Sequence, residues 1–182
     1  MHIAIISGSN RMGRKSHGIA QYLEKTISER PEVEKVTMLD VHEYNFPVMD
    51  ERRGRLDDPH PGLEEFGKTV ESCDAVVIVT PEYNGGMAGS LKNTLDYFRP
   101  EFDHKVMTAV TVSSGSFGGV NALHQLWFWM NYVGGIITPQ KLLVSHVNDV
   151  FDENGEVQDE RFLRNSGKTI DDLIWLAQKI MD

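Results

Sequence analysis

Residues 7–16 combine hydroxyl, glycine and basic side chains in one short turn, a set suited to binding an anion. They read Ser-Gly-Ser-Asn-Arg-Met-Gly-Arg-Lys-Ser and follow an apolar run that begins at Ile3. A turn between a strand and a helix presents backbone N–H groups and the positive helix end to an anion. Arg11 can add two parallel hydrogen bonds, while Ser9 and Ser16 offer hydroxyl donors. We therefore expect a terminal phosphate to bind here; the alternative is a tight connection with solvated basic side chains.

Three other phosphate chemistries use a turn in this place, and the sequence disfavours each. A nucleotide triphosphatase loop needs Gly-Lys-Ser four residues after Gly8, but Arg14 intervenes, and the third apolar run ends in Thr80 rather than a magnesium-binding Asp. The dinucleotide fingerprint needs glycines at its first, third and sixth positions, which this turn lacks, although Asp40 ends the second expected strand, where a ribose ligand lies in such sites. A tyrosine-phosphatase-like loop needs a nucleophilic Cys ahead of its Arg, and the turn has none.

A second cluster follows the apolar, β-branched run 75–80. The run breaks into residues 81–89, Pro-Glu-Tyr-Asn-Gly-Gly-Met-Ala-Gly, and then into a segment with helical spacing over 90–98. Ligands of open parallel sheets bind just outside the carboxyl ends of the strands. An exposed Tyr83 beside flexible glycines at such an end predicts a surface for a flat ring.

A third turn, residues 113–119, follows the apolar run 106–112 and reads Ser-Ser-Gly-Ser-Phe-Gly-Gly. We expect the three turns to form one continuous crevice, because the carboxyl ends of parallel strands meet at one edge of the sheet. A phosphate at one end of the crevice and a flat ring at the other describe flavin mononucleotide (FMN).

The elements that must position these turns alternate along the chain. Five apolar runs are separated by segments with helical spacing, and this alternation is typical of βαβ units. The runs cover residues 3–7, 33–39, 75–80, 106–112 and 136–144. They are mostly continuous, as expected for a parallel sheet with helices on both faces. We predict an α/β, flavodoxin-like three-layer sandwich, one domain over residues 1–182, with a five-stranded parallel sheet of order 2-1-3-4-5.

Two further segments differ from this regular pattern. Residues 42–61 are rich in Pro, Asp and Arg and are expected to form a long loop, a kind of segment that is often functional. The helix expected over residues 120–133 contains Leu-Trp-Phe-Trp-Met-Asn-Tyr from Leu126 onward. Consecutive large side chains point around more than one side of a helix, and aromatic residues are enriched at interfaces. We favour a subunit contact here; the alternative is a core helix that also forms a pocket wall.

The charge and composition of the chain limit the classes of partner that it is expected to bind. The chain has 27 acidic and 18 basic residues, which give a net charge of -9. Such a charge repels phosphate backbones and anionic membranes, so we expect no nucleic acid and no membrane partner. The chain starts directly with a strand-like segment, has no basic leader and has no apolar run near the ~20 residues that span a bilayer, so we expect a cytoplasmic protein. The lone Cys73 is expected to be a buried thiol.

The motifs of these turns resemble those of the NADPH-dependent FMN reductase family, a group of flavodoxin-like proteins that includes quinone, chromate and azo-dye reductases. Two motifs in the right order carry the resemblance, and shorter matches extend it along nearly the whole chain. The two are Gly8-Ser9-Asn10-Arg11-Met12-Gly13-Arg14 and Pro81-Glu82-Tyr83-Asn84-Gly85; the shorter ones are Leu39-Asp40, Asn45-Phe46-Pro47, Leu91-Lys92-Asn93 with Asp96, and Phe151-Asp152-Glu153-Asn154-Gly155.

The resemblance implies a set of cofactor contacts. The FMN phosphate would be held by Ser9, Arg11 and Ser16. The isoalloxazine ring would be lined by Pro81, Glu82, Tyr83, Asn84 and Gly85, and its pyrimidine side would be approached by Ser113, Ser114, Gly115 and Gly118. Backbone N–H donors there would stabilise the negative charge that reduction places on the ring. We assign no catalytic acid, and we expect Glu82 to orient backbone instead.

The resulting hypothesis is an FMN-dependent NAD(P)H oxidoreductase that passes hydride from NADPH, or NADH, through FMN to a small-molecule acceptor. Acceptor classes are quinones, free flavins, azo compounds and metal oxyanions. The alternatives are a non-catalytic FMN-binding electron carrier or redox sensor, and a nucleotide-binding enzyme that uses the first turn for another phosphate ester. The resemblance also implies a homodimer or homotetramer. The seven His residues lack ligand spacing, so no metal site is expected. For His17 we favour a solvated residue at a helix start; the alternative is that it assists the phosphate turn.

Overall fold

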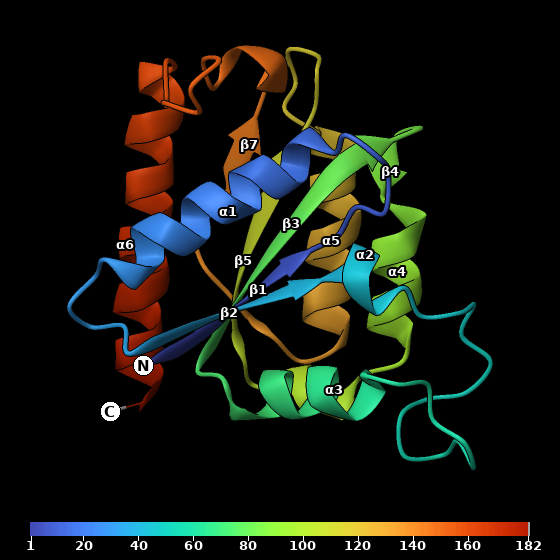
Figure 1. The fold of residues 1–182 in the computed structure, drawn as a ribbon. Helices are drawn as coiled ribbons and strands as arrows, with labels where there is room; N and C mark the ends of the chain where they lie inside the picture. The colour runs from blue at the N-terminus through green and yellow to red at the C-terminus, as the bar shows by residue number, and fades with distance from the viewer. Residues whose placement is uncertain (182) are drawn as a thin grey trace.

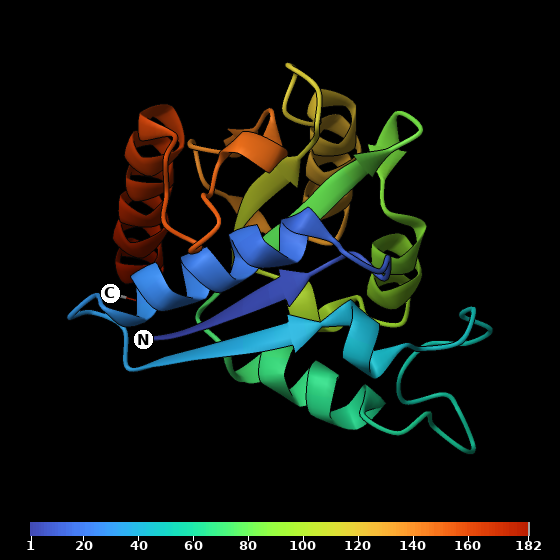
Figure 2. The same cartoon turned by 45° about the horizontal axis from the view of Figure 1, so that its top comes forward.

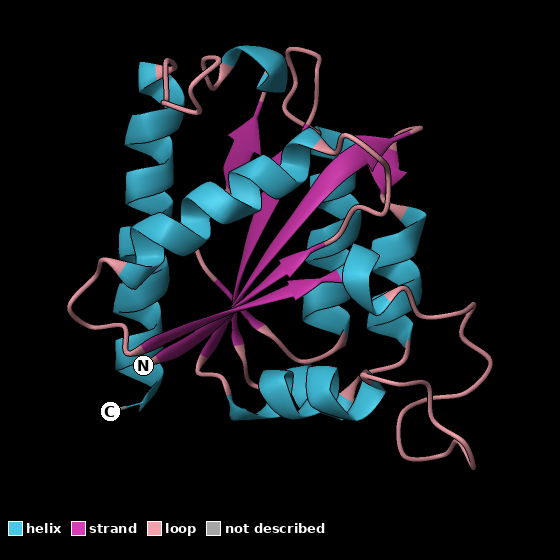
Figure 3. Ribbon diagram, viewed as in Figure 1, coloured by secondary structure: helices cyan, strands magenta, loops and turns pink. Residues whose placement is uncertain are grey.

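The computed structural model describes residues 1–181 and shows a twisted sheet between two layers of helices (Figures 1 and 3). The strands are β1 (His2–Ser7), β2 (Lys35–Asp40), β3 (Ala75–Tyr83), β4 (Gly86–Met87), β5 (Val106–Val112), β6 (Ile136–Ile137) and β7 (Leu142–Val144). The main path of the sheet is β2-β1-β3-β5-β6, and all of these neighbours are parallel. The strand β7 also pairs with β5, and β4 forms an antiparallel hairpin with β3.

The helices divide between the two faces of the sheet. They are α1 (Lys15–Ser28), α2 (Val41–Tyr44), α3 (Leu63–Ser72), α4 (Gly89–Asp96), α5 (Val120–Tyr132) and α6 (Glu160–Met181), with 3-10 turns at Pro100–Phe102 and Val147–Asp149. Helices α1 and α6 cover one face, and α3, α4 and α5 cover the other (Figures 1 and 2). No helix within residues 1–181 has the length and apolar character needed to cross a membrane.

The burial pattern of β1 explains why the predicted runs are continuous rather than alternating. Ile3 and Ile5 join the core under α1 and α6, whereas Ala4 and Ile6 join the core under α3, α4 and α5. Successive side chains of a strand point to opposite faces, so a strand buried on both sides needs apolar residues at every position. The predicted α/β, flavodoxin-like class is confirmed.

The predicted count of five strands was wrong, because the sheet contains seven within the described residues. The run 136–144 forms two short strands, β6 against the start of β5 and β7 against its end. Pro139 lies in the break and has no backbone N–H to give to a ladder. The additional strand β4 comes from the turn after β3, and the predicted loop 42–61 begins with the short helix α2.

Candidate functional site

The turn after β1 is pressed between β3 and α4. The backbone N–H of Gly8 donates to the carbonyl of Val79 at 2.8 Å, and the hydroxyl of Ser90 donates to the carbonyl of Gly8 at 3.0 Å. A Cβ atom at Gly8 would lie 2.9 Å from the side chain of Leu91 and 3.0 Å from the carbonyl oxygen of Val79. Only glycine therefore permits this close approach of the turn to its neighbours.

The turns after β1 and β3 meet at one rim of the sheet. The hydroxyls of Ser9 and Tyr83 are hydrogen-bonded at 2.8 Å, and the guanidinium carbon of Arg11 lies 5.3 Å from the centre of the Tyr83 ring. A cation over an aromatic face at this distance is attracted to it. Side chains of the two turns thus contact each other directly at this rim.

Ser16 has an unusual environment at the start of α1. Its side chain is buried, yet its Oγ has no hydrogen-bond partner within the described part of the chain. A buried hydroxyl without a partner costs about 1–3 kcal/mol. Ser16 also lines the cavity beside the turn, so an oxygen of a bound phosphate is a fitting acceptor.

A polar network supports the far side of the same turn. Asp40, the last residue of β2, forms two hydrogen bonds with the guanidinium of Arg14 and accepts one from the backbone N–H of His42 at 3.0 Å. Burial alone would raise the pKa of Asp40, but these hydrogen bonds and the charge of Arg14 outweigh it and hold the pKa below its usual value. His17 was expected to be solvated, and this was wrong: its Nδ1 lies 3.0 Å from the Ser7 hydroxyl and 3.5 Å from Asp40.

The turn after β3 is a tight hairpin. Strand β3 continues to Tyr83, three residues beyond the predicted end, because Tyr83 pairs with Gly86 of β4 and Pro81 pairs with Val112 of β5. Asn84 and Gly85 connect the strands with φ values of 50° and 76°. An Asn-Gly pair with two positive φ angles is the preferred two-residue hairpin turn, since its twist matches that of the strands.

Glu82 couples this hairpin to the third turn. Its carboxylate accepts hydrogen bonds from the backbone N–H groups of Asn121 at 2.9 Å and Ala122 at 3.3 Å, and from the Asn121 side chain at 3.2 Å. These groups belong to the first turn of α5, whose N-terminal residues lack partners within the helix. Gly119, at the N-cap position, has no side chain to supply them, so Glu82 acts as the cap from a neighbouring strand.

A cavity of about 320 Å³ lies where the three turns meet. It is lined by Arg11, Met12, Gly13, Arg14, Lys15, Ser16, Pro81, Glu82, Tyr83, Val112, Ser113, Ser114, Val147 and Asn148. Seven of the predicted contacts are among these residues, and Ser9 adjoins them through its bond to Tyr83. The geometry therefore brings Ser113 and Ser114, two of the three serines of the 113–119 turn, to the same cavity as the phosphate turn.

The other predicted contacts lie elsewhere. Asn84 and Gly85 are exposed at the hairpin tip, and the carbonyl of Gly115 accepts a hydrogen bond from the backbone N–H of His146. Gly118 is buried with φ 62°, and a Cβ there would lie 2.8 Å from Leu143, so its glycine serves the packing of the turn. None of these four lines the cavity.

Sequence reasoning missed Val147 and Asn148, which enter the cavity from the segment after β7. The backbone N–H of Val147 donates to the carbonyl of Ser113 at 3.2 Å, which ties this segment to the third turn. Neither residue type carries a chemical signal, and only the pairing of β7 with β5 brings them to the rim. Across residues 1–181 there is no group of three or more His, Cys, Asp or Glu side chains arranged to hold a metal ion.

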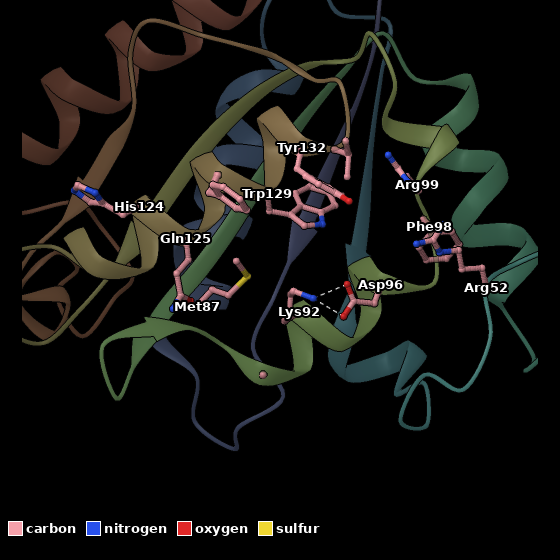
Figure 4. A pocket seen from close by; sticks show the side chains of 13 residues that line it. Arg52, Met87, Lys92, Asp96, Phe98, Arg99, His124, Gln125, Trp129 and Tyr132 are labelled. Carbon is pink, nitrogen blue, oxygen red and sulfur yellow. Dashed lines mark hydrogen bonds and ion pairs between the residues drawn. The ribbon is translucent and has the colours of Figure 1, made fainter.

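A second hollow lies between α4 and α5 on the other side of the hairpin (Figure 4). This apolar groove encloses about 830 Å³, and it is lined by Arg52, Met87, Gly89, Lys92, Asp96, Phe98, Arg99, His124, Gln125, Phe128, Trp129, Tyr132 and Val133. Trp129 belongs to the core, whereas Phe128 and Tyr132 are 72% and 63% exposed and stack on each other. The aromatic helix is thus both core and surface.

Comparison with known proteins decides the family. The family model for NADPH-dependent FMN reductase matches residues 1–149. The chain belongs to the NADPH-dependent FMN reductase family. An NAD(P)H-dependent FMN reductase of Pseudomonas aeruginosa is 30% identical over 161 residues, which cover 86% of this chain and 84% of that protein. An NADPH azoreductase of Bacillus sp. strain OY1-2 is 29% identical over 152 residues, covering 82% of this chain and 80% of the relative.

Solved structures agree on the fold of this FMN reductase family member. FerB, a flavoenzyme NAD(P)H:(acceptor) oxidoreductase from Paracoccus denitrificans, superposes with a TM-score of 0.79 over 98% of this chain and 97% of its own, at 23% identity. The resemblance predicted from the two turn motifs is confirmed by the family match.

Proposed function

We propose that this protein is an FMN-dependent NAD(P)H oxidoreductase whose cofactor lies in the cavity formed by the three turns. The observation that carries the proposal is the buried Ser16 hydroxyl, which has no partner among the described residues and lines a cavity beside Arg11 and the start of α1. This donor set fits a phosphate. The hydrogen bond between Ser9 and Tyr83 joins the 9–16 and 81–85 turns, and this supports a single site for the phosphate and the ring.

Each of the three turns has its own binding role in this proposal. Ser16, Arg11 and the N-terminal N–H groups of α1 would hold the FMN phosphate. Pro81 and Tyr83 would flank the ring, and Ser113 and Ser114 would approach its polar edge. Ser9 is engaged by Tyr83, so we propose that it exchanges this partner for the phosphate or holds Tyr83 in place.

When bound, FMN supplies two-electron transfer between NAD(P)H and an acceptor. The protein would position the reactants, and backbone N–H donors of the 113–119 turn would stabilise negative charge at the polar edge of the ring. Glu82 has its carboxylate engaged by α5 and therefore orients backbone rather than exchanging protons.

Quinones and azo compounds are the acceptors we propose to test first. Relatives named quinone reductase include one from Escherichia coli that is 27% identical over 168 residues, and the Bacillus relative is named an azoreductase. Both classes of acceptor are flat and conjugated, so they suit a slot that also admits a nicotinamide ring.

The decisive experiment is an absorption spectrum of the purified protein before and after anaerobic NADPH. We expect a yellow protein that bleaches on NADPH addition and releases FMN on denaturation, followed by steady NADPH oxidation when a quinone is supplied. A colourless protein that cannot bind added FMN would refute the proposal. Bleaching by an artificial reductant but not by NADPH would instead favour the electron carrier or redox sensor.

We further propose a homodimer or homotetramer in which a second copy covers the groove between α4 and α5. The exposed Phe128 and Tyr132 support this, because large aromatic side chains at the surface are typical of interfaces. A cytoplasmic location is also proposed, since a single buried cysteine suits a reducing compartment.

A further inference from the structure

We propose that Asp40 and Arg14 form a positioning pair that fixes the shape of the phosphate-binding turn, and that this pair makes the site select FMN over riboflavin. The inference rests on the proposed function, since it concerns the same cavity. It assigns a role to two residues that make no predicted contact with the cofactor.

The first observation is that one guanidinium group bridges both ends of the turn. Nη1 of Arg14 donates to the carbonyl oxygen of Ser9 at 2.9 Å and to one oxygen of Asp40, while Nη2 donates to the other oxygen of Asp40 at 2.6 Å. Arg14 lies at the end of the turn, immediately before α1, and Ser9 lies near its beginning, immediately after Gly8. The bridge thus closes residues 9–14 into a loop of fixed span.

The second observation is that Asp40 is a rigid anchor. Its side chain is only 4% exposed, and its backbone pairs with Ser7 in the register of β1 and β2. It also accepts the N–H of His42 at the start of α2. A planar guanidinium that is held at two points by such a carboxylate has little freedom, so its hydrogen bond to Ser9 is directed.

A third observation separates the tasks of the two arginines. The charge of Arg14 is neutralised by Asp40, whereas Arg11 is exposed and lies over the Tyr83 ring. Arg11 is therefore available to a phosphate, as is the exposed Lys15 of the same cavity, and Arg14 sets the backbone from which Arg11 and the buried Ser16 extend. This arrangement leaves the guanidinium of Arg14 engaged by Ser9 and Asp40.

The consequence can be measured without turnover, because riboflavin has the same ring as FMN but no phosphate. A positioning role in the turn predicts a loss of affinity for FMN alone. We expect Asp40→Asn to weaken FMN binding about tenfold or more, which is the size of effect expected when one set of charge-assisted hydrogen bonds is disturbed. The affinity for riboflavin should change less than about twofold.

The experiment titrates flavin-free protein with FMN and with riboflavin and follows flavin fluorescence. The double variant Arg14→Met/Asp40→Leu replaces the ion pair by apolar groups and leaves no unpaired buried charge, so it guards against simple unfolding. It also removes the bond to Ser9 and is expected to lose FMN preference as Asp40→Asn does. Asp171→Asn is the matched control, since Asp171 pairs with Arg30 beyond the opposite end of α1.

The expected result is a loss of FMN preference in both Asp40 variants, an unchanged preference in Asp171→Asn, and partial rescue in Asp40→Glu. Equal weakening of both flavins, or an unchanged FMN preference in the folded double variant, would overturn the inference while leaving the proposed function intact. A wild-type protein that binds neither flavin would overturn both.

Discussion

The contact between Glu82 and α5 gives a quantitative prediction about how two turns of the site are held together. Replacing Glu82 by Ala removes an acceptor from the backbone N–H groups of Asn121 and Ala122. Loss of an N-terminal cap costs about 0.5–2 kcal/mol, and the interaction of a carboxylate with the helix dipole accounts for about 0.3–1 kcal/mol of such effects. We therefore expect the free energy of unfolding to fall by about 1–2 kcal/mol.

The Gln variant separates hydrogen bonding from charge. Glu82→Gln keeps one acceptor oxygen but loses the negative charge, so we expect about half of the effect of Glu82→Ala. For a chain of this size the Ala variant should lower Tm by about 2–8 °C. Thermal and denaturant unfolding of the flavin-free protein measure both variants. Because no flavin is bound to this form, changes in cofactor binding cannot contribute to the measured stability.

Glu153→Ala is the matched control for the Glu82 variants. Glu153 is exposed in the turn that follows Phe151, and its replacement should change the free energy of unfolding by less than about 0.5 kcal/mol. A Glu82→Ala protein as stable as this control would refute the capping argument. Equal losses in the Ala and Gln variants would show that the charge, rather than hydrogen-bond number, carries the effect.

Two further predictions concern other parts of the molecule. Phe128→Glu places a charge on the groove between α4 and α5 and should reduce the proposed oligomer to a smaller species in sedimentation analysis. Leu163→Glu on α6, at a similarly exposed apolar position, should leave the assembly unchanged, and a wild-type monomer would contradict the proposed interface. Burial raises the pKa of Cys73 to about 11, so the thiolate fraction at about pH 8 falls about 100-fold. The folded protein should therefore react with a thiol reagent at least that much more slowly than the denatured protein. Rapid labelling of the folded protein would contradict the burial.

The fold was predictable because both faces of its sheet are buried. Continuous apolar runs mark β1, β3 and β5 clearly, and Ile19, Leu23 and Ile27 mark the covered face of α1. The extension of β3 to Tyr83 could not be read in the same way. It depends on pairing with β4 and β5, which are contacts between residues distant in sequence or across a turn.

The site was predictable to the extent that local chemistry marks it. Hydroxyls and arginine in one turn, and Tyr83 in another, indicate binding without any knowledge of the fold. The hydrogen-bond partners of these groups, in contrast, depend on the three-dimensional structure. Asp40 binds Arg14 across 26 positions of sequence, and Val147 reaches the cavity because β7 ends at the same rim. His17 was misjudged because Ser7 and Asp40 are brought to it by the ends of β1 and β2.

The division of one expected strand into β6 and β7 also affects how the sheet meets other chains. An unpaired sheet edge invites intermolecular strand addition, and short edge strands limit it. Beyond β5 the edge consists of two and three residues on either side of a break that contains Pro139. A foreign strand could not form a long unbroken ladder there, so this border is protected against aggregation and strand exchange. The opposite border, β2, is six residues long, and its first residue is the exposed Lys35, a charge that opposes stacking of like edges.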